Sequence, residues 1–225
     1  MSASKPIVAI DGPAGSGKST IAKLIAKKLG LFYIDTGAMY RALAFKAKKA
    51  GITPDNENGM AELAKAIDLD LRYDAQTGKL VVLLEGQDIS EEIRKPYITE
   101  DVSFIAKIKE VREHMVRLQR RLAEGKRSIL EGRDIATVVF PDAYKKFYLD
   151  ANPAERIKRR YLEMKEKGIP IDEFSVKKDI ERRDRIDSTR EHAPLRRAHD
   201  AVYIDTTDMA IDEVARRIIE EIEKT

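Results

Sequence analysis

Residues 12–19 of this chain read GPAGSGKS and match the pattern G-x-x-x-x-G-K-[ST]. The apolar run PIVAID precedes the match and a helical pattern follows it, which is the setting that the motif requires. There, glycines let backbone N–H groups turn toward phosphate oxygens, and the helix N-terminus adds a partial positive charge. Lys18 would reach the β- and γ-phosphates, and Ser19 would place its hydroxyl on Mg²⁺. The motif therefore predicts a nucleoside triphosphate site made by Gly12, Pro13, Ala14, Gly15, Ser16, Gly17, Lys18, Ser19 and Thr20.

Short apolar runs separated by amphipathic segments predict an α/β fold with a parallel sheet. The five candidate strands are residues 6–11, 31–35, 128–132, 146–150 and 201–205. Residues 68–84 break this alternation and read as a hairpin with a turn around Gln76–Gly78, so we expect an inserted subdomain at about residues 60–100. Residues 209–224 form an amphipathic pattern, which predicts a final helix that covers the sheet.

Composition narrows the function classes. Of 225 residues, 42 are basic and 39 acidic, and a net charge of +3 gives little support for a nucleic-acid-binding protein. The chain has no cysteine, which excludes disulfides, thiolate metal sites and cysteine nucleophiles. It also has no run of about 18 apolar residues, so we expect a cytoplasmic protein that does not enter membranes.

A second group of charges follows other predicted strands. Arg41 lies in DTGAMYR after the second strand, and Arg133 and Asp134 follow the third. In RRDRIDSTR, the i, i+4, i+7 spacing places Arg183, Asp187 and Arg190 on one face of a predicted helix. Parallel strands bring such positions to the edge where the phosphate loop lies, which favours a site for a small anionic acceptor.

Each of these charges also has a plainer interpretation. Arg133 and Asp134 could form a local ion pair at the strand end, and the charged helices could be solvated surface. A GTP switch is disfavoured because the guanine-reading N-K-x-D motif is absent. A kinase for a small acceptor fits the length of the chain better than a nucleic-acid-driven motor does.

Four segments taken together resemble the bacterial-type cytidylate kinase family: AIDGPAGSGKST, DTGAMYR, EGRDIATVVFPDA and RDRIDSTR followed by APL. The resemblance implies a P-loop nucleoside monophosphate kinase fold in a single domain over residues 1–225. It has a five-stranded parallel core sheet flanked by helices, the small β-containing insert at 60–100, and a helical lid at 152–170. It also implies Mg²⁺-dependent transfer of a phosphoryl group from ATP to CMP or dCMP. We expect a monomer without nucleic-acid or membrane partners, because nothing in the sequence demands a dimer.

The resemblance assigns roles to residues by motif. The catalytic residues would be Lys18, Arg133 and Arg190. The 5′-phosphate of CMP would meet Arg41, Arg133 and Arg190, and the ribose would meet Asp187 and Arg183. The base would meet Ser103, Arg112 and Asp134, with Thr36 and Tyr40 close by. The lid would bring Arg156, Arg159 and Arg160 toward ATP. Mg²⁺ would contact Ser19, largely through water and the phosphates.

Two alternatives remain open at this stage. One is a P-loop kinase for a different small acceptor, such as another nucleoside monophosphate or shikimate. The other is a nucleotide-dependent regulatory or nucleic-acid-binding module, which would hydrolyse ATP without phosphorylating an acceptor.

Overall fold

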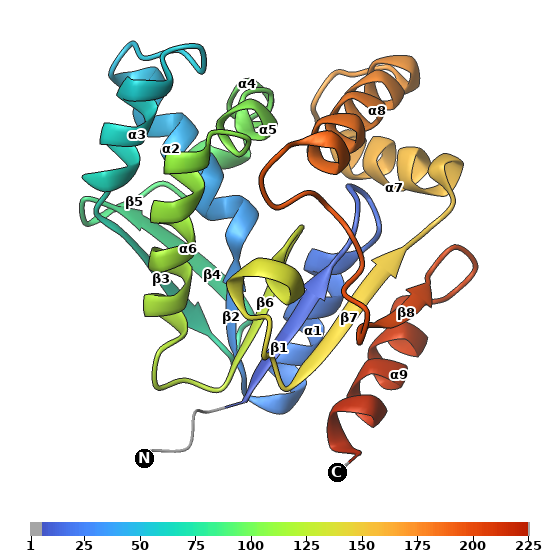
Figure 1. Cartoon of the computed structure of the whole chain (residues 1–225). Coiled ribbons are helices and arrows are strands. Elements are labelled where there is room, and N and C mark those ends of the chain that lie inside the picture. Colours follow the sequence, from blue (N-terminus) through green and yellow to red (C-terminus); the bar gives the residue numbers. More distant parts are fainter. Residues whose placement is uncertain (1–5, 225) are drawn as a thin grey trace.

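The computed structural model describes residues 6–224, and its centre is a five-stranded parallel sheet (Figure 1). In spatial order the strands are β2 (Phe32–Asp35), β6 (Ser128–Gly132), β1 (Ile7–Asp11), β7 (Lys145–Asp150) and β8 (Val202–Asp205). Side chains of β1 and β6 are buried on both faces, as expected of central parallel strands. All five predicted strands and their parallel pairing are confirmed.

Helices cover the sheet on both faces. The first, α1 (Lys18–Leu29), lies behind the sheet in Figure 1 and packs against β6 and α9 (Ile211–Glu223). The predicted final helix is thus confirmed. On the other side, α6 (Lys109–Ala123) packs against β2 and against a five-residue π-helix, η2 (Ile135–Val139).

The predicted hairpin forms a second, antiparallel sheet beside β2. It contains β3 (Leu69–Asp74), β4 (Lys79–Leu84) and β5 (Gln87–Asp88). In its register, Leu69 pairs with Leu84 and Leu71 with Val82. Leu69 and Leu71 are buried and the residue between them is exposed, as expected of a strand with one face on the core. The helices of this region are α2 (Thr36–Lys49), α3 (Glu57–Lys65), η1 (Glu92–Arg94), α4 (Pro96–Thr99) and α5 (Val102–Ile105).

Two further helices, α7 (Pro153–Glu166) and α8 (Glu173–Thr189), lie above the carboxyl ends of the strands in Figure 1. They pack on each other around Ile157, Val176 and Ile180, a small cluster separate from the main core. The last helical residue of α8 is Thr189, and Arg190 is the C-cap of this helix. Its φ of −62° and its N–H bond to the Ile186 carbonyl at 3.1 Å keep its side chain beside Asp187, as the helical spacing predicted, with 3.7 Å between the two charged groups.

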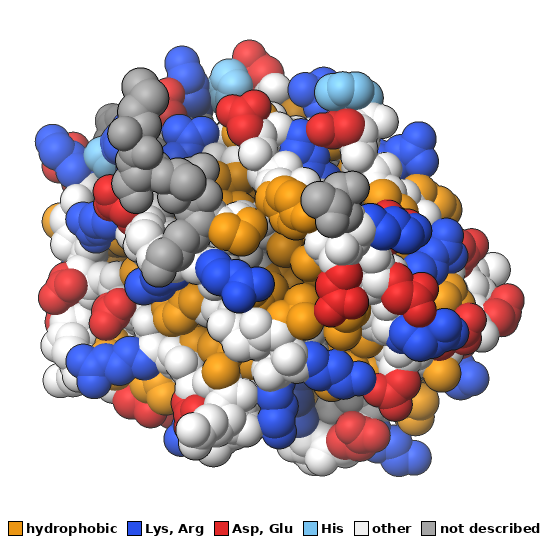
Figure 2. All heavy atoms as spheres, turned by 90° about the horizontal axis from the view of Figure 1, so that it is seen from below, with side chains coloured by type: hydrophobic (Ala, Val, Ile, Leu, Met, Phe, Trp, Pro, Cys, Tyr) orange, Lys and Arg blue, Asp and Glu red, His pale blue; other side chains and the backbone are white. Residues whose placement is uncertain are grey.

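Within residues 6–224, no helix is both long enough and apolar enough to cross a membrane. Viewed from the amino ends of the strands, basic and acidic side chains are interspersed, with no continuous basic track (Figure 2).

Candidate active site

The phosphate loop connects β1 to α1, and its shape depends on glycine. Gly12 has a φ of 150°, and a Cβ there would lie 1.9 Å from the Leu149 carbonyl oxygen. Only glycine fits so close to β7. Gly17, with a φ of 87°, precedes the first residue of α1, so the helix N-terminus faces the loop. The strand–loop–helix setting predicted for the motif is confirmed.

Lys18 is buried and lies over its own loop. Its Nζ donates to the Pro13 carbonyl at 2.6 Å and to the Ser16 hydroxyl at 3.3 Å. Burial, with the nearby Arg133 guanidinium, lowers the pKa of Lys18 to about 7. An anion in the loop would offset this cost of burying an ammonium group.

The carboxyl ends of β1 and β6 bring the phosphate loop close to residues predicted to bind the phosphoryl acceptor. Asp11 pairs in register with Gly132, so the phosphate loop and Arg133 leave adjacent strands side by side. Gly132 has no room for a side chain, because a Cβ would lie 2.7 Å from the Thr36 hydroxyl. That hydroxyl donates to the Glu131 carbonyl at 2.7 Å, so Thr36 links β2 to β6.

Arg133 and Asp134 do not pair with each other. Arg133 donates through Nε to Asp187 at 3.0 Å. Asp134 is buried, accepts a hydrogen bond from Arg112 and lies 3.7 Å from Arg190. The two neighbours therefore belong to one network of charges from the segment between β6 and η2, from α6 and from the end of α8, and the local ion-pair interpretation is wrong.

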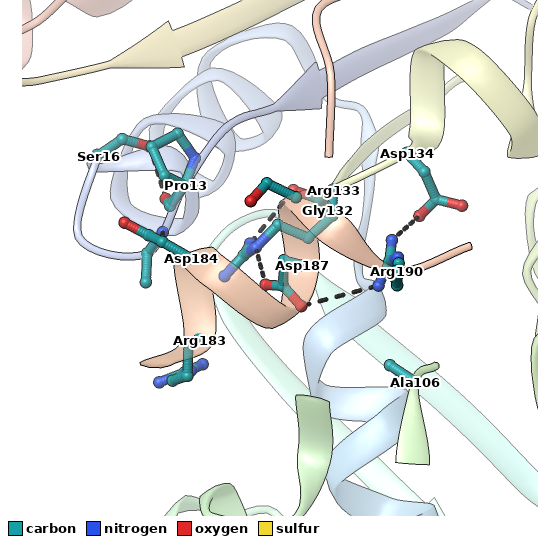
Figure 3. A network of polar contacts seen from close by, with 12 residues as sticks. Pro13, Ser16, Ala106, Gly132, Arg133, Asp134, Arg183, Asp184, Asp187 and Arg190 are labelled. Atoms are coloured by element: carbon teal, nitrogen blue, oxygen red, sulfur yellow. Dashed lines mark hydrogen bonds and ion pairs between the residues drawn. The ribbon is translucent and has the colours of Figure 1, made fainter. Parts of the chain in front are cut away.

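Asp187 joins the two halves of this network (Figure 3). One of its carboxylate oxygens accepts from Arg133, and the other lies 3.7 Å from Arg190. Burial is the main factor that lowers the pKa of Arg190, with the positive charge of Arg112 next. Three guanidinium groups and two carboxylates leave this network with a net positive charge, and Arg133 lies near enough to Lys18 to lower its pKa, which suits an anionic ligand.

Several buried polar atoms in this region have no hydrogen-bond partner among the described residues. They are the Tyr40 hydroxyl, the Nε atoms of Arg41 and Arg183, and one Nη of Arg190. Unpaired buried donors are costly and rare in native proteins, so they indicate a ligand that completes them. All four belong to residues that the sequence assigned to the acceptor.

The remaining acceptor candidates have different surroundings. Arg41 donates to Asp35 at 3.0 Å, and Asp35 also caps the N-terminus of α2. Arg183 lies 3.5 Å from Asp179 on its own helix. Ser103 is buried on α5, and within residues 6–224 no hydrogen bond joins its hydroxyl to the charge network.

The three arginines predicted to belong to a lid lie in three different environments. Arg156 is buried and donates to the Ala14 carbonyl of the phosphate loop at 3.0 Å. Arg159 points elsewhere and donates to the carbonyls of Thr206 and Thr207 at 2.6 and 3.1 Å. Arg160 contacts Glu163 on its own helix at 2.7 Å. Of the three, Arg156 is the one in contact with the phosphate loop.

Three carboxylates that the sequence did not single out lie at the site. Asp184 accepts from Arg156 at 2.5 Å and from the Ala14 N–H at 3.4 Å. Glu131 accepts from the Tyr33 hydroxyl at 2.5 Å, and burial raises its pKa. Asp11 accepts from backbone groups of η2. Position at a strand end was a usable signal for Asp11 and Glu131, whereas nothing distinguished Asp184 from its charged neighbours.

Comparisons with known proteins agree with this geometry. The model of the family "Cytidylate kinase" matches residues 8–224. A cytidylate kinase from Caldanaerobacter subterraneus is 48% identical over 96% of this chain and 94% of its own length. One from Geobacter sulfurreducens is 50% identical over 94% and 90%.

The fold also matches a solved structure, that of an uncharacterized protein from Eubacterium ventriosum. The TM-score is 0.51 at 14% sequence identity, and the match covers 98% of this chain and all of the other. This likeness concerns the fold alone. The match to the family model over nearly the whole chain, with relatives near 50% identity, shows that this chain belongs to the cytidylate kinase family.

Proposed function

We propose that this chain transfers the γ-phosphoryl group of ATP to CMP and dCMP. The observation that carries the proposal is the buried charge network of Arg112, Arg133, Asp134, Asp187 and Arg190, which adjoins a phosphate loop. It joins cations suited to a phosphate with a carboxylate suited to an amino group. Membership of the cytidylate kinase family supports cytosine as the source of that amino group.

ATP would bind with its phosphates in the loop of residues 12–18. Backbone N–H groups of the loop and the N-terminus of α1 would surround the phosphate oxygens. The Lys18 Nζ would exchange the Pro13 carbonyl for the β- and γ-phosphates. Arg156 supports the same end of the site because it already contacts the Ala14 carbonyl.

The acceptor would occupy the side of the network that holds the unpaired donors. Its 5′-phosphate would meet Arg41, Arg133 and Arg190, because a guanidinium fork donates two parallel bonds to phosphate and keeps its charge. Its ribose would meet Asp187 and Arg183. Within residues 6–224, the Arg183 Nε and one Nη of Arg190 are buried without a hydrogen-bond partner, which supports both assignments.

Base choice would depend on Asp134. Cytosine carries an amino donor at N4, and a carboxylate is its natural acceptor. Uracil presents an oxygen at that position, which would face Asp134 with no proton between them. Arg112 would hold the carboxylate in place, with Tyr40 beneath its guanidinium at 5.9 Å and Ser103 completing the pocket.

The transfer needs no general base from the protein. The second pKa of a phosphate monoester is near 6, so the acceptor is mostly a dianion at neutral pH. The main barrier is repulsion between two polyanions, about 4 kcal/mol for two unit charges 4 Å apart at an effective dielectric of about 20. Lys18, Arg133 and Arg190 would neutralise this charge and keep the two phosphates in line.

Mg²⁺ fits the residues around the loop. This ion usually keeps several waters and takes few protein ligands alongside substrate phosphates. Ser19 offers a hydroxyl near the start of α1, and residues 6–224 contain no group of three side chains that would enclose a metal without substrate. Mg²⁺ would be held by Ser19, water and ATP, and when bound it would neutralise charge on the phosphate oxygens.

An ADP-release assay with CMP, dCMP, UMP and AMP in parallel tests the proposal. We expect CMP and dCMP to be the preferred acceptors, and turnover to stop with EDTA and return with added Mg²⁺. Equal or better use of UMP or AMP would refute the assignment of the base site. ATP hydrolysis that RNA or DNA stimulates, without any acceptor phosphorylation, would support the binding-module alternative.

A further inference from the structure

The π-helix η2 begins directly after Asp134, and a residue from another strand holds its N-terminus. The two oxygens of Asp11 accept from the backbone N–H groups of Ile135 and Ala136, each at 2.8 Å. Asp11 is 1% exposed and ends β1, immediately before the phosphate loop. A carboxylate thus satisfies two N–H groups that the helix itself cannot pair.

The backbone of Asp134 depends on the same short helix. Its carbonyl accepts from the N–H groups of Val138 and Val139 at 2.9 and 3.2 Å. Asp134 is therefore held to η2 by these backbone bonds, and to α6 by the Arg112 guanidinium on its side chain. A small shift of η2 would move the carboxylate relative to Arg112.

The opposite end of η2 is held as well. Arg120 donates through Nε to the Val139 carbonyl at 2.8 Å and through an Nη to the Val138 carbonyl at 2.9 Å. It lies on α6, the helix that also carries Arg112. One helix therefore fixes both the end of η2 and the side chain of Asp134.

We propose that Asp11 and Arg120 are positioning residues for base selection, which clamp η2 at its two ends and so set where Asp134 meets the cytosine amino group. This inference rests on the proposed function. Because Gly12 follows Asp11, the clamp also ties the position of the base-reading carboxylate to the start of the phosphate loop. Neither residue needs to touch a substrate for this role.

The experiment compares kcat/KM for CMP and for UMP in wild type, Arg120→Ala, Asp11→Asn and a control, Arg117→Ala. Arg117 is an exposed arginine of α6 that contacts His114 and not η2. In Asp11→Asn, one N–H of η2 would face an amide N–H₂ instead of a carboxylate oxygen. Because a misplacement of about 1 Å at an active site can cost about 100-fold, even small shifts of η2 are measurable.

We expect the CMP:UMP ratio of kcat/KM to fall about threefold in Arg120→Ala and about tenfold in Asp11→Asn. The KM for ATP should stay within about twofold of wild type in both, and the control should keep the wild-type ratio. A purely structural role would lower thermal stability and leave the ratio unchanged, and that result in Arg120→Ala would overturn the inference. Arg120 is exposed, so Arg120→Ala decides the question even if Asp11→Asn does not fold. A wild type that shows no preference for CMP would instead refute the proposed function.

Discussion

The donor and acceptor sides of this site are built in different ways. The donor side is one continuous loop, and its main side chain, Lys18, donates to the loop's own Pro13 carbonyl. The acceptor side brings together residues from α6, α8 and the segment after β6, whose charges pair with one another across long stretches of chain. Phosphate binding can thus be encoded by consecutive residues, whereas recognition of a particular acceptor depends on tertiary structure.

The two sides also differ in what a substrate must replace. In the proposed donor loop, an incoming phosphate would take over one hydrogen bond of Lys18 and relieve the cost of its burial. On the proposed acceptor side, the substrate would enter a network in which Asp134 and Asp187 already pair with the arginines. The paired carboxylates keep those cations oriented before the acceptor arrives, which reduces the cost of ordering them on binding.

The largest effect is expected from Lys18→Ala. Without the ammonium group, charge on the transferring phosphate is poorly neutralised, and kcat should fall by about 1,000-fold. Because the buried ammonium is costly, as its lowered pKa indicates, thermal unfolding should show no loss of stability. Lys27→Ala, an exposed change on the same helix, should match wild type. Wild-type turnover in Lys18→Ala would refute the assignment of the donor loop.

Asp134→Ala tests the acceptor side, with at least a tenfold loss of kcat/KM for CMP expected from the lost hydrogen bond to the base. The ratio of kcat/KM for CMP to kcat/KM for UMP should fall at the same time, because UMP gains nothing from the carboxylate. Removal of one partner from a buried ion pair typically costs about 3–5 kcal/mol of stability, so the assays should be run well below the melting temperature. Asp142→Asn, an exposed carboxylate nearby, is the control. An unchanged ratio would exclude Asp134 from base recognition.

The sequence predicted most of the fold because the relevant signals are local. Each core strand is a short apolar run, and GPAGSGKS carries the full geometry of the donor loop. The hairpin was predictable for the same reason, from two β-rich runs around a turn.

The partners of the charged residues were not predictable in this way. Arg133 and Asp134 are adjacent in sequence, yet they pair with Asp187, 54 residues away, and Arg112, 22 residues away. The alternation of apolar and polar positions along the sequence predicts which residues enter the core, but it does not predict which charged side chains pair with each other. The capping of η2 by Asp11, over 124 residues, is a further example. Helical spacing did predict that Arg190 lies near Asp187, but it could not show that Arg190 also lies 3.7 Å from Asp134, 56 residues away in the chain.

Arg133→Ala should separate the two sides most clearly in steady-state kinetics. The KM for CMP should rise about tenfold, because a charge-assisted bond to phosphate is lost, whereas the KM for ATP should change by less than about threefold. Arg94→Ala, a change to an exposed arginine outside the charge network, is the control. A defect confined to ATP would show that Arg133 serves the donor.

The smallest effects are expected in α7, the helix predicted to form a lid, where the structure distinguishes arginines that the sequence could not separate. Arg156 contacts the phosphate loop, so Arg156→Ala should raise the KM for ATP about fivefold. Arg159 is already engaged by Thr206 and Thr207, so Arg159→Ala should leave the KM for ATP within about twofold. It should instead lower stability by about 1–2 kcal/mol, because the carbonyls of Thr206 and Thr207 lose a charged donor. Parallel ATP titrations and thermal melts of the two variants measure both effects. Equal ATP defects would mean that Arg159 leaves these carbonyls to bind ATP, and would remove the distinction between the two arginines.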